Sequence, residues 1–420
     1  NPSSWKLRNK HKKRDSLMTY VSKILTQMPG VFKPQQKAIL ALLSAMMCFS
    51  GRATMRNLAR YGTGSTKRLR RWATTGFNFF QLNEFLFKET QAISFNQREE
   101  ERPRQAILID ATFTQKSGKH TAGLGFFHNG SSPSAKKCQQ GLEFTLFAAL
   151  NVDEREAYAL GVHQSDGDSS LGVACAQLVH NKHYYHQISK HIVADGYYAR
   201  DGFVSALKRH GFELITLLRR DAALRCLYEG GYSGRGRPKR YLDNVDYDDL
   251  GAWDRQDDLF KDKTVYSKIV NYKSWCRDLK VLVIISRSGE RKILCSTDLS
   301  MSPAEILELY QLRFQIEFLF RDAKQNTGLG HAQTLDAQGQ AYFANASLTA
   351  LNLFRLEERD QAIMGGEARH ERVSSIRSLK SRKHHEFILN LFISRLAQSR
   401  DEENLKAAYE EVSRVGMVAA

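Results

Sequence analysis

The sequence lacks the features that would place the protein in a membrane or in an oxidising compartment. It has no apolar run of about 18 residues or more, which argues against a membrane-spanning helix. The basic N-terminal end shows no signal-peptide pattern. The six cysteines are scattered and none forms a C-x-x-C pair, which argues against a zinc ribbon and a disulfide framework. These absences predict a cytoplasmic protein with reduced thiols.

Acidic residues are scarce in the first quarter of the chain. Residues 1–104 contain 20 Lys and Arg against 6 Asp and Glu, a net charge of +14 out of +17 for all 420 residues. A basic region of this kind favours a polyanionic partner, because each neutralised phosphate releases condensed counterions. An acidic membrane surface would attract the same charge, but the region lacks a strong amphipathic anchor. We therefore expect nucleic acid, and no membrane, to bind at this end.

Apolar spacing predicts that this basic region is helical. A solvated arm over residues 1–14 precedes expected helices at 16–30 and 34–49, and the second is apolar enough to belong to a core. A linking helix and a charged linker are expected over 78–104. Residues 1–104 are thus predicted to form one helical DNA-binding region.

A helix-turn-helix is the predicted DNA-binding element of this region. Short helical segments at 54–60 and 65–73 are joined by a glycine-containing turn, and Ser65 can cap the second. The candidate DNA contacts on the second helix are Lys67, Arg68, Arg70 and Arg71. A charged helix on a small bundle is the alternative, and the basic background favours DNA.

From residue 105 the pattern changes to that of an α/β domain. Strands are expected at 105–113, 142–150, 156–163, 191–195 and 213–219, and helices at 168–181 and 199–209. Two of these strands carry a carboxylate: Asp110 lies within ILIDATF, and Asp195 ends HIVAD. A buried carboxylate is costly unless a cation pairs with it. Asp166 and Asp168 are rival carboxylates in a loop, and Asp195 is preferred because loops are commonly acidic for solubility alone.

Residues 221–300 are predicted to be a β-rich insertion, with strands at 263–271, 279–286 and 291–295. Its basic tip contains Arg235 and Arg237 in a sequence that resembles the core of an AT-hook, a minor-groove element. An exposed basic loop near DNA is an equal alternative. Further helices are expected at 337–358 and 371–398, and the tail to residue 420 is expected to be helical.

A helix beginning at Ser302 carries four polar residues on one stripe. Ser302 can cap it, with Pro303 in the first turn and Glu305 completing a capping box. The stripe consists of Tyr310, Arg313, Glu317 and Lys324, at spacings of 3, 4 and 7 residues. Taken alone, the stripe favours an internal Arg313–Glu317 ion pair with Lys324 on the surface. If Asp110 and Asp195 lie on neighbouring strands, Glu317 can instead complete an all-oxygen site for Mg²⁺, with Mn²⁺ as a substitute, suited to two-metal phosphoryl transfer.

Together, these residues resemble bacterial DDE transposases of the insertion-sequence-four family, which carry a Tyr-Arg-Glu-Lys signature. The resemblance covers residues ~105–355 and implies a ribonuclease-H-like fold with a β-rich insertion. It also implies that Asp110, Asp195 and Glu317 are catalytic and bind Mg²⁺, while Tyr310, Arg313 and Lys324 hold phosphates and a distorted base at the transposon end. Similar enzymes cut through a hairpin and stack a flipped base on an aromatic residue of the insertion, for which Trp253 and Trp275 are the candidates. A place in the core is the favoured alternative for both tryptophans.

The predicted protein is therefore a bacterial, cytoplasmic DNA transposase that associates with the nucleoid when bound to DNA. Its expected fold is a mixed α/β sheet flanked by helices. The predicted parts are the DNA-binding region 1–104, the catalytic domain 105–220 and 301–358 around the insertion 221–300, and a helical region 359–420. It is expected to act as a homodimer on transposon ends and target DNA. A ribonuclease-H-like nuclease without strand transfer and a transposase-derived DNA-binding regulator are the alternatives.

Overall fold

The computed structural model describes residues 17–62, 65–95, 103–129, 138–165, 169–232, 234, 236–259, 262–364 and 375–396, with 406, 407, 409 and 412. The chain divides into two compact units. One contains Gln91–Arg321, and the other contains Asn1–Thr90 together with Asp322–Ala420. Among the described residues, no helix is both long and apolar enough to cross a membrane.

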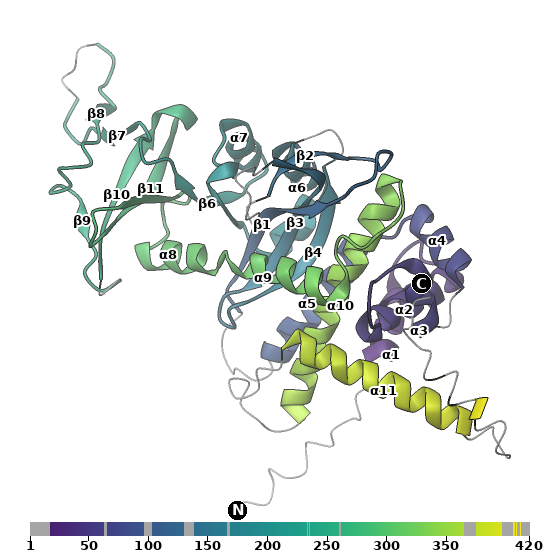
Figure 1. Ribbon diagram of the computed structural model, residues 1–420. Coiled ribbons are helices and arrows are strands. Elements are labelled where there is room, and N and C mark those ends of the chain that lie inside the picture. The colour runs from purple at the N-terminus through teal and green to yellow at the C-terminus, as the bar shows by residue number, and fades with distance from the viewer. Residues whose placement is uncertain are drawn as a thin grey trace, which may run out of the picture. The chain divides into compact units, whose positions relative to one another are not determined.

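The unit Gln91–Arg321 is built on one mixed sheet of twelve strands within the described residues (Figure 1). The strands are β1 Gln105–Gln115, β2 Gly125–His128, β3 Cys138–Asn151, β4 Glu156–Gln164, β5 His191–Ala194, β6 Glu213–Leu218, β7 Leu224–Leu227, β8 Tyr241–Asn244, β9 Asp254–Arg255, β10 Lys263–Tyr272, β11 Arg277–Ser286 and β12 Arg291–Ser296. The main order is β2-β3-β1-β5-β6-β12-β11-β10-β7-β8, with β4 paired to β3 and β9 to β10. Only β1–β5 and β5–β6 are parallel among these pairs. The mixed α/β prediction is confirmed.

The two faces of the central strands differ in what covers them. On one face Phe147 stacks on Tyr185 of α6 (Ser170–Ile188), with ring centroids 5.0 Å apart. Phe147 pairs with Ile109, so the next residue of β1, Asp110, points to the opposite face. The face of the sheet that carries Asp110 is therefore the face opposite α6. Arg313, from a later part of the chain, contacts Asp110 there.

The strands of residues 221–300 continue the same sheet. β12 pairs antiparallel with β6, placing Leu294 opposite Leu217, and β11, β10, β7 and β8 follow outward. The predicted strands at 263–271, 279–286 and 291–295 are present as β10, β11 and β12. The sequence did not predict β2, β7, β8 and β9. Each of these strands has only two to four residues and too little alternation to indicate a strand.

The helix expected from Ser302 is capped as predicted but is not continuous. Ser302 and Glu305 form a complete capping box at the start of α8 (Pro303–Leu312). α9 (Gln315–Asp322) follows after a break and passes into a π-helical segment, Ala323–Thr327. At the break, backbone hydrogen bonds run from residue i to residue i−3 in place of the i→i−4 bonds of an α-helix. One of them joins Glu317 N to Phe314 O at 3.0 Å. The single-helix prediction is therefore wrong, because the chain tightens at Arg313 and Phe314.

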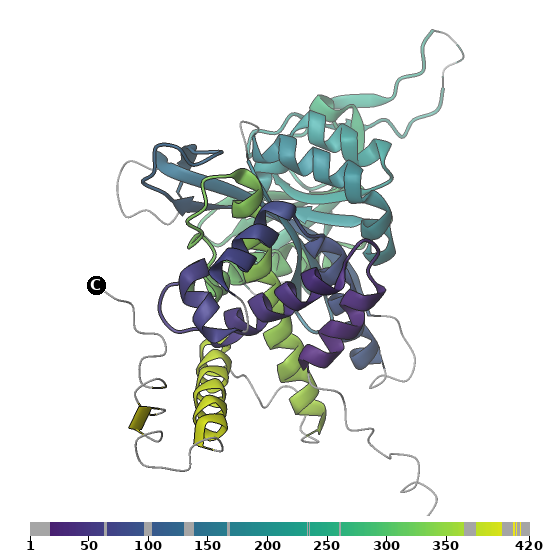
Figure 2. The ribbon, with the colours of Figure 1, turned by 90° about the vertical axis from the view of Figure 1, so that its right-hand side faces the viewer.

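The other unit is helical, as Figure 2 shows for its N-terminal helices beside α10 and α11. The helices are α1 Leu17–Gln27, α2 Lys33–Cys48, α3 Met55–Tyr61, α4 Thr66–Thr75, α5 Phe79–Phe95, α10 Ala337–Met364 and α11 Ile376–Leu396, and α5 continues past Thr90. The apolar helix α2 packs against α1, α3, α10 and α11. A buried hydrogen bond of 3.0 Å joins Asn352 Nδ2 to Asn83 Oδ1. The arm 1–14, the linker 96–102 and most of the C-terminal tail lie outside the described residues.

Candidate active site

The two strand aspartates lie at the same edge of the sheet. β1 and β5 run in parallel with Ile109 opposite Ala194, so Asp110 and Asp195 follow at equivalent positions. Backbone N–H groups hold both carboxylates: Ala111 N donates to Asp110 Oδ1 at 2.8 Å, and Tyr197 N donates to Asp195 Oδ1 at 3.0 Å. The parallel register thus brings together two carboxylates that are 85 residues apart in the sequence, from 110 to 195.

Arg313 connects this edge to the helix that carries Glu317. Its Nη1 lies 3.3 Å from Asp110 Oδ2, and its Nη2 lies 2.9 Å from Glu317 Oε1. The side chains of Arg313 and Asp110 are each 18% exposed, whereas that of Glu317 is 55% exposed. The Arg313–Glu317 ion pair suggested by the stripe is present, and the same guanidinium also pairs with a strand aspartate. Residues from β1 and the α8–α9 segment therefore meet through one cation.

The carboxylates carry more negative charge than this cation balances. Burial and the nearby charge of Asp195 raise the pKa of Asp110 to about 6, although Ala111 N–H and Arg313 oppose the change. Burial also raises the pKa of Asp195, and the charge of Glu317 adds to this effect. Because burial disfavours the ionised carboxylates, an additional positive charge would stabilise the ionised site.

Tyr310 belongs to the same cluster. Its ring lies beneath the Arg313 guanidinium, 5.9 Å from the ring centroid to Cζ. Burial raises the pKa of its phenol. Lys324, the last residue of the predicted stripe, is exposed on the π-helical segment and belongs to the other compact unit. The structure therefore groups Tyr310, Arg313 and Glu317 with Asp110.

Tyr198 is a neighbour of the site that the sequence analysis did not select. It is 1% exposed, and its hydroxyl has no hydrogen-bond partner among the described residues. Burial raises its pKa well above the ordinary value, and the charges of Asp110 and Asp195 act in the same direction. Its position three residues after Asp195, in the sequence ADGYY, was the available signal.

The donor atoms fit a hard divalent cation by their chemistry. Carboxylate oxygens are the ligands that Mg²⁺ prefers, and burial, the largest cause of both raised pKa values, disfavours the ionised aspartates unless a cation offsets it. Within the described part of the chain, no three His, Cys, Asp or Glu side chains are grouped in a way that could hold a metal ion. As the side chains stand, the Arg313 guanidinium bonds Asp110 and Glu317.

The two helices predicted for the helix-turn-helix are present as α3 and α4. Thr54 and Ser65 cap these helices by accepting hydrogen bonds from Asn57 N and Arg68 N, each at 3.2 Å. On α4, Lys67, Arg70 and Arg71 are exposed, and Arg68 is half-buried. Part of the turn between the helices lies outside the described residues.

A cavity of about 500 Å³ lies beside these helices. It is lined by Met55, Arg56, Arg70, Ala73, Thr74, Ala332, Gln333, Thr334 and Phe343. Arg56 on α3 therefore joins Arg70 of α4 on one basic surface, although the sequence analysis did not select it. Its position in the second residue of α3, within the same basic region, was the available signal.

The other residues predicted to contact DNA do not line this cavity. The side chains of Trp253 and Trp275 are 7% and 8% exposed, so a base could stack on either only after the ring had moved outward. Arg237 is exposed near the β7–β8 hairpin. Arg235, Asp166 and Asp168 lie outside the described residues.

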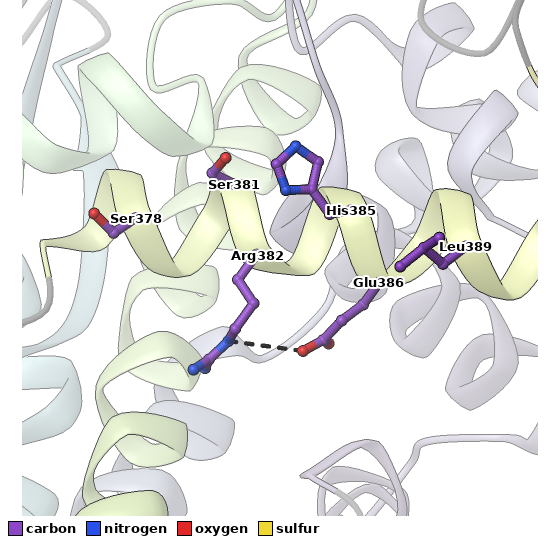
Figure 3. Close-up of a pocket in the computed structure, with 6 residues that line it drawn as sticks. All are labelled: Ser378, Ser381, Arg382, His385, Glu386 and Leu389. Atoms are coloured by element: carbon purple, nitrogen blue, oxygen red, sulfur yellow. Dashed lines mark ion pairs between the residues drawn. The ribbon is translucent and has the colours of Figure 1, made fainter.

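A depression on α11 has a different character (Figure 3). It is lined by six residues of that helix alone: Ser378, Ser381, Arg382, His385, Glu386 and Leu389. Arg382 Nε and Glu386 Oε1 form an ion pair of 3.7 Å across it. Its mixed charges provide no cluster of carboxylates, so the edge at Asp110 remains the stronger candidate for catalysis.

Comparison with protein families gives a match for this chain. Residues 101–353 match the family model described as the transposase DDE domain, which covers more than half of the chain. That match includes Asp110, Asp195, Arg313 and Glu317. A comparison with curated proteins gives no significant match.

Proposed function

Because the chain belongs to the transposase DDE domain family, we propose that it is a DNA transposase of an insertion sequence, with a ribonuclease-H-like catalytic domain. The observation that carries the proposal is the shared edge of Asp110 and Asp195, linked through Arg313 to Glu317. The Tyr310, Arg313, Glu317 and Lys324 spacing further supports membership of the insertion-sequence-four family. These residues belong to one proposed catalytic machinery.

In this proposal, Asp110, Asp195 and Glu317 hold two Mg²⁺ ions, and Mn²⁺ can replace them. Bound ions of this kind favour ionisation of the attacking oxygen and stabilise the negative charge on the leaving oxygen. The backbone N–H groups of Ala111 and Tyr197 orient the two aspartates. Tyr310, Arg313 and Lys324 bind the DNA phosphates and a distorted base near the cut.

The proposed chemistry is two in-line displacements at phosphorus. In cleavage, the oxygen of water bonds to phosphorus, the bond to the 3′-oxygen breaks, and the 3′-oxygen receives a proton. In joining, that 3′-hydroxyl loses its proton, its oxygen bonds to a phosphorus of target DNA, the bond from that phosphorus to a target 3′-oxygen breaks, and the released 3′-oxygen receives a proton. Between the two, the 3′-hydroxyl can first displace a 3′-oxygen of the opposite strand, which receives the proton, so that the end closes into a hairpin with a base stacked on Trp253 or Trp275. Water then breaks the new bond and restores the 3′-hydroxyl for joining.

The basic helical unit is proposed to bind the terminal inverted repeats. Arg56 and Arg70 line one cavity, and Lys67 and Arg71 are exposed on the same helix as Arg70. Arg68 and the exposed Arg237 would add phosphate contacts, as would Arg235. A dimer, with each protomer holding one transposon end, matches the need to join two ends to one target. The proposed location is the bacterial cytoplasm, at the nucleoid when DNA is bound.

A cleavage assay tests this function directly. The substrate is a plasmid that carries the gene with its native flanking DNA, incubated with Mg²⁺. The wild type should nick it, and Glu317→Ala should not, while both bind DNA equally. Glu308→Ala is the matched control, because Glu308 lies on α8 but pairs with Arg104 at 2.7 Å. A fully active Glu317→Ala protein would refute the assignment, and absence of Mg²⁺-dependent nicking by the wild type would favour the regulator.

Joining distinguishes a transposase from a nuclease. A labelled, pre-cleaved duplex end is incubated with plasmid DNA, and covalent transfer of the label is measured. The proposal predicts joined product. Nicking without joined product would favour the ribonuclease-H-like nuclease.

A further inference from the structure

The position of Arg313 presents a conflict with metal binding at the same carboxylates. Its two terminal nitrogens bond Asp110 Oδ2 and Glu317 Oε1 at 3.3 and 2.9 Å. The charge of Arg313 also acts on Asp195. One guanidinium thus pairs with two carboxylates and partly offsets the charge of a third. A divalent cation that used these two oxygens would compete with Arg313 for them and would be repelled by its positive charge.

Arg313 and a divalent cation therefore compete for the same two carboxylate oxygens. Resting on the proposed function, we propose that Arg313 is an internal counter-ion, which leaves Asp110 and Glu317 when the metal binds and moves to a DNA phosphate. The metal replaces its charge on the carboxylates, and the phosphate replaces the carboxylates as its partner. Arg313 is then a regulatory residue of the site as well as a DNA contact.

The chemistry of arginine suits such an exchange. A guanidinium binds carboxylate and phosphate with the same planar pair of N–H donors, so its two partners are interchangeable. Glu317 is 55% exposed, which leaves this side of the ion pair open to solvent and to an approaching backbone. The Asp110 side chain, at 18% exposed, is the more enclosed partner.

The exchange makes metal binding and DNA binding depend on each other. DNA that takes the guanidinium frees the carboxylates for metal, and metal that takes the carboxylates frees the guanidinium for DNA. By linkage, each ligand then raises the affinity for the other by the same factor. Removing the guanidinium should raise metal affinity without DNA and should reduce this coupling.

The first experiment measures Mn²⁺ binding without DNA, from the electron paramagnetic resonance signal of free Mn²⁺. Arg313→Gln should bind Mn²⁺ about tenfold more tightly than the wild type, within the usual range of coupling between sites. The matched control is Arg104→Gln. Arg104 also bridges two carboxylates, Asp153 at 3.0 Å and Glu308 at 2.7 Å, but at the other end of β1. The control should bind Mn²⁺ as the wild type does. Equal or weaker binding by Arg313→Gln would overturn the proposal.

The second experiment measures affinity for a random-sequence duplex, which supplies phosphates independently of sequence. Adding Mn²⁺ should raise the affinity of the wild type severalfold more than that of Arg313→Gln. Circular dichroism confirms that the variant is folded, and Arg313→Lys, which keeps the charge without the planar fork, should show intermediate coupling. An equal Mn²⁺ effect in the wild type and Arg313→Gln would contradict the exchange.

A third variant separates failure of this inference from failure of the proposed function. Asp110→Asn should lose most Mn²⁺ binding if the carboxylates form the metal site. If Asp110→Asn binds Mn²⁺ as tightly as the wild type, the metal site itself is wrong. If it loses binding while Arg313→Gln gains none, the metal site stands and the counter-ion role is wrong.

Discussion

The two ends of strand β5 hold acidic centres of opposite character. At its start, Asp298 accepts hydrogen bonds from Lys190 Nζ at 2.7 Å, His191 Nε2 at 2.9 Å and Ser300 Oγ at 2.6 Å. Burial alone would raise the pKa of Asp298, but these donors outweigh it and hold the pKa well below its usual value. After its end lies Asp195, beside Asp110. Arg313 pairs with Asp110 and acts on Asp195 only through its charge, and the pKa values of both aspartates are raised.

The difference separates a structural carboxylate from a candidate catalytic one. Asp298 has enough donors to be stable when ionised, so it gains nothing from a further cation. Asp110 and Asp195 are buried with less compensation, which costs stability and leaves them able to bind positive charge. A strand end that is poorly compensated is the expected place for a metal-dependent site.

The largest expected effect is on catalysis. Asp195→Asn should lower the rate of Mg²⁺-dependent cleavage about 10³-fold or more, because a lost metal ligand removes several kcal/mol of transition-state stabilisation. Asp298→Asn, at the other end of β5, should keep the rate within about threefold below its melting temperature. Cleavage kinetics on one substrate compare the two. Similar losses in both variants would remove the distinction between the two ends.

The next effect is on stability at the compensated end. Asp298→Asn should destabilise the protein by about 1–2 kcal/mol, because it weakens charge-assisted hydrogen bonds to partly exposed donors. The pKa of Asp298 is lower in the folded protein than its ordinary value of 3.8. Asp298 therefore stabilises the fold fully at pH values above 3.8, and this stabilisation is lost as the pH falls through the lowered pKa. Urea unfolding at pH 7 and pH 3 measures this. An unchanged midpoint at pH 7 would show that the cluster does not stabilise the fold.

The smallest expected effect is a gain in stability, opposite in sign to the loss expected for Asp298→Asn. Asp110→Asn should stabilise the protein by about 1–2 kcal/mol at pH 7.5, because it removes a buried charge whose ionisation is unfavourable. The folded pKa of about 6 exceeds the ordinary value of 3.8, so the cost of ionisation grows as the pH rises between these values. The gain should therefore vanish near pH 4. A destabilised Asp110→Asn protein at pH 7.5 would mean that Arg313 compensates this carboxylate fully.

The sequence contains enough information to predict the two strand aspartates. The apolar residues directly before Asp110 and directly before Asp195 are buried, and an uninterrupted apolar run of this kind is typical of an interior strand. The capping box at Ser302 depends on residues three positions apart, and it formed as expected. Patterns between residues that are close in the sequence can be predicted without knowledge of the fold.

The contacts of Arg313 depend on long-range geometry and could not be predicted in full. Its bond to Glu317 follows from the i, i+4 spacing, but its bond to Asp110 joins residues 203 positions apart. The break after Leu312 likewise has no proline or glycine to signal it. The burial of the Tyr198 hydroxyl beside the aspartates also depends on the parallel pairing of β1 and β5.

The central claim is that the Asp110 carboxylate binds the catalytic metal, and a change of metal specificity tests it most directly. Asp110→Cys replaces a hard oxygen ligand with a softer thiolate, which Mg²⁺ binds poorly and Mn²⁺ tolerates better. Cleavage by this variant is measured with each metal beside the wild type. The account predicts no cleavage with Mg²⁺ and partial recovery with Mn²⁺. Cleavage by Asp110→Cys with Mg²⁺ at the wild-type rate would contradict it.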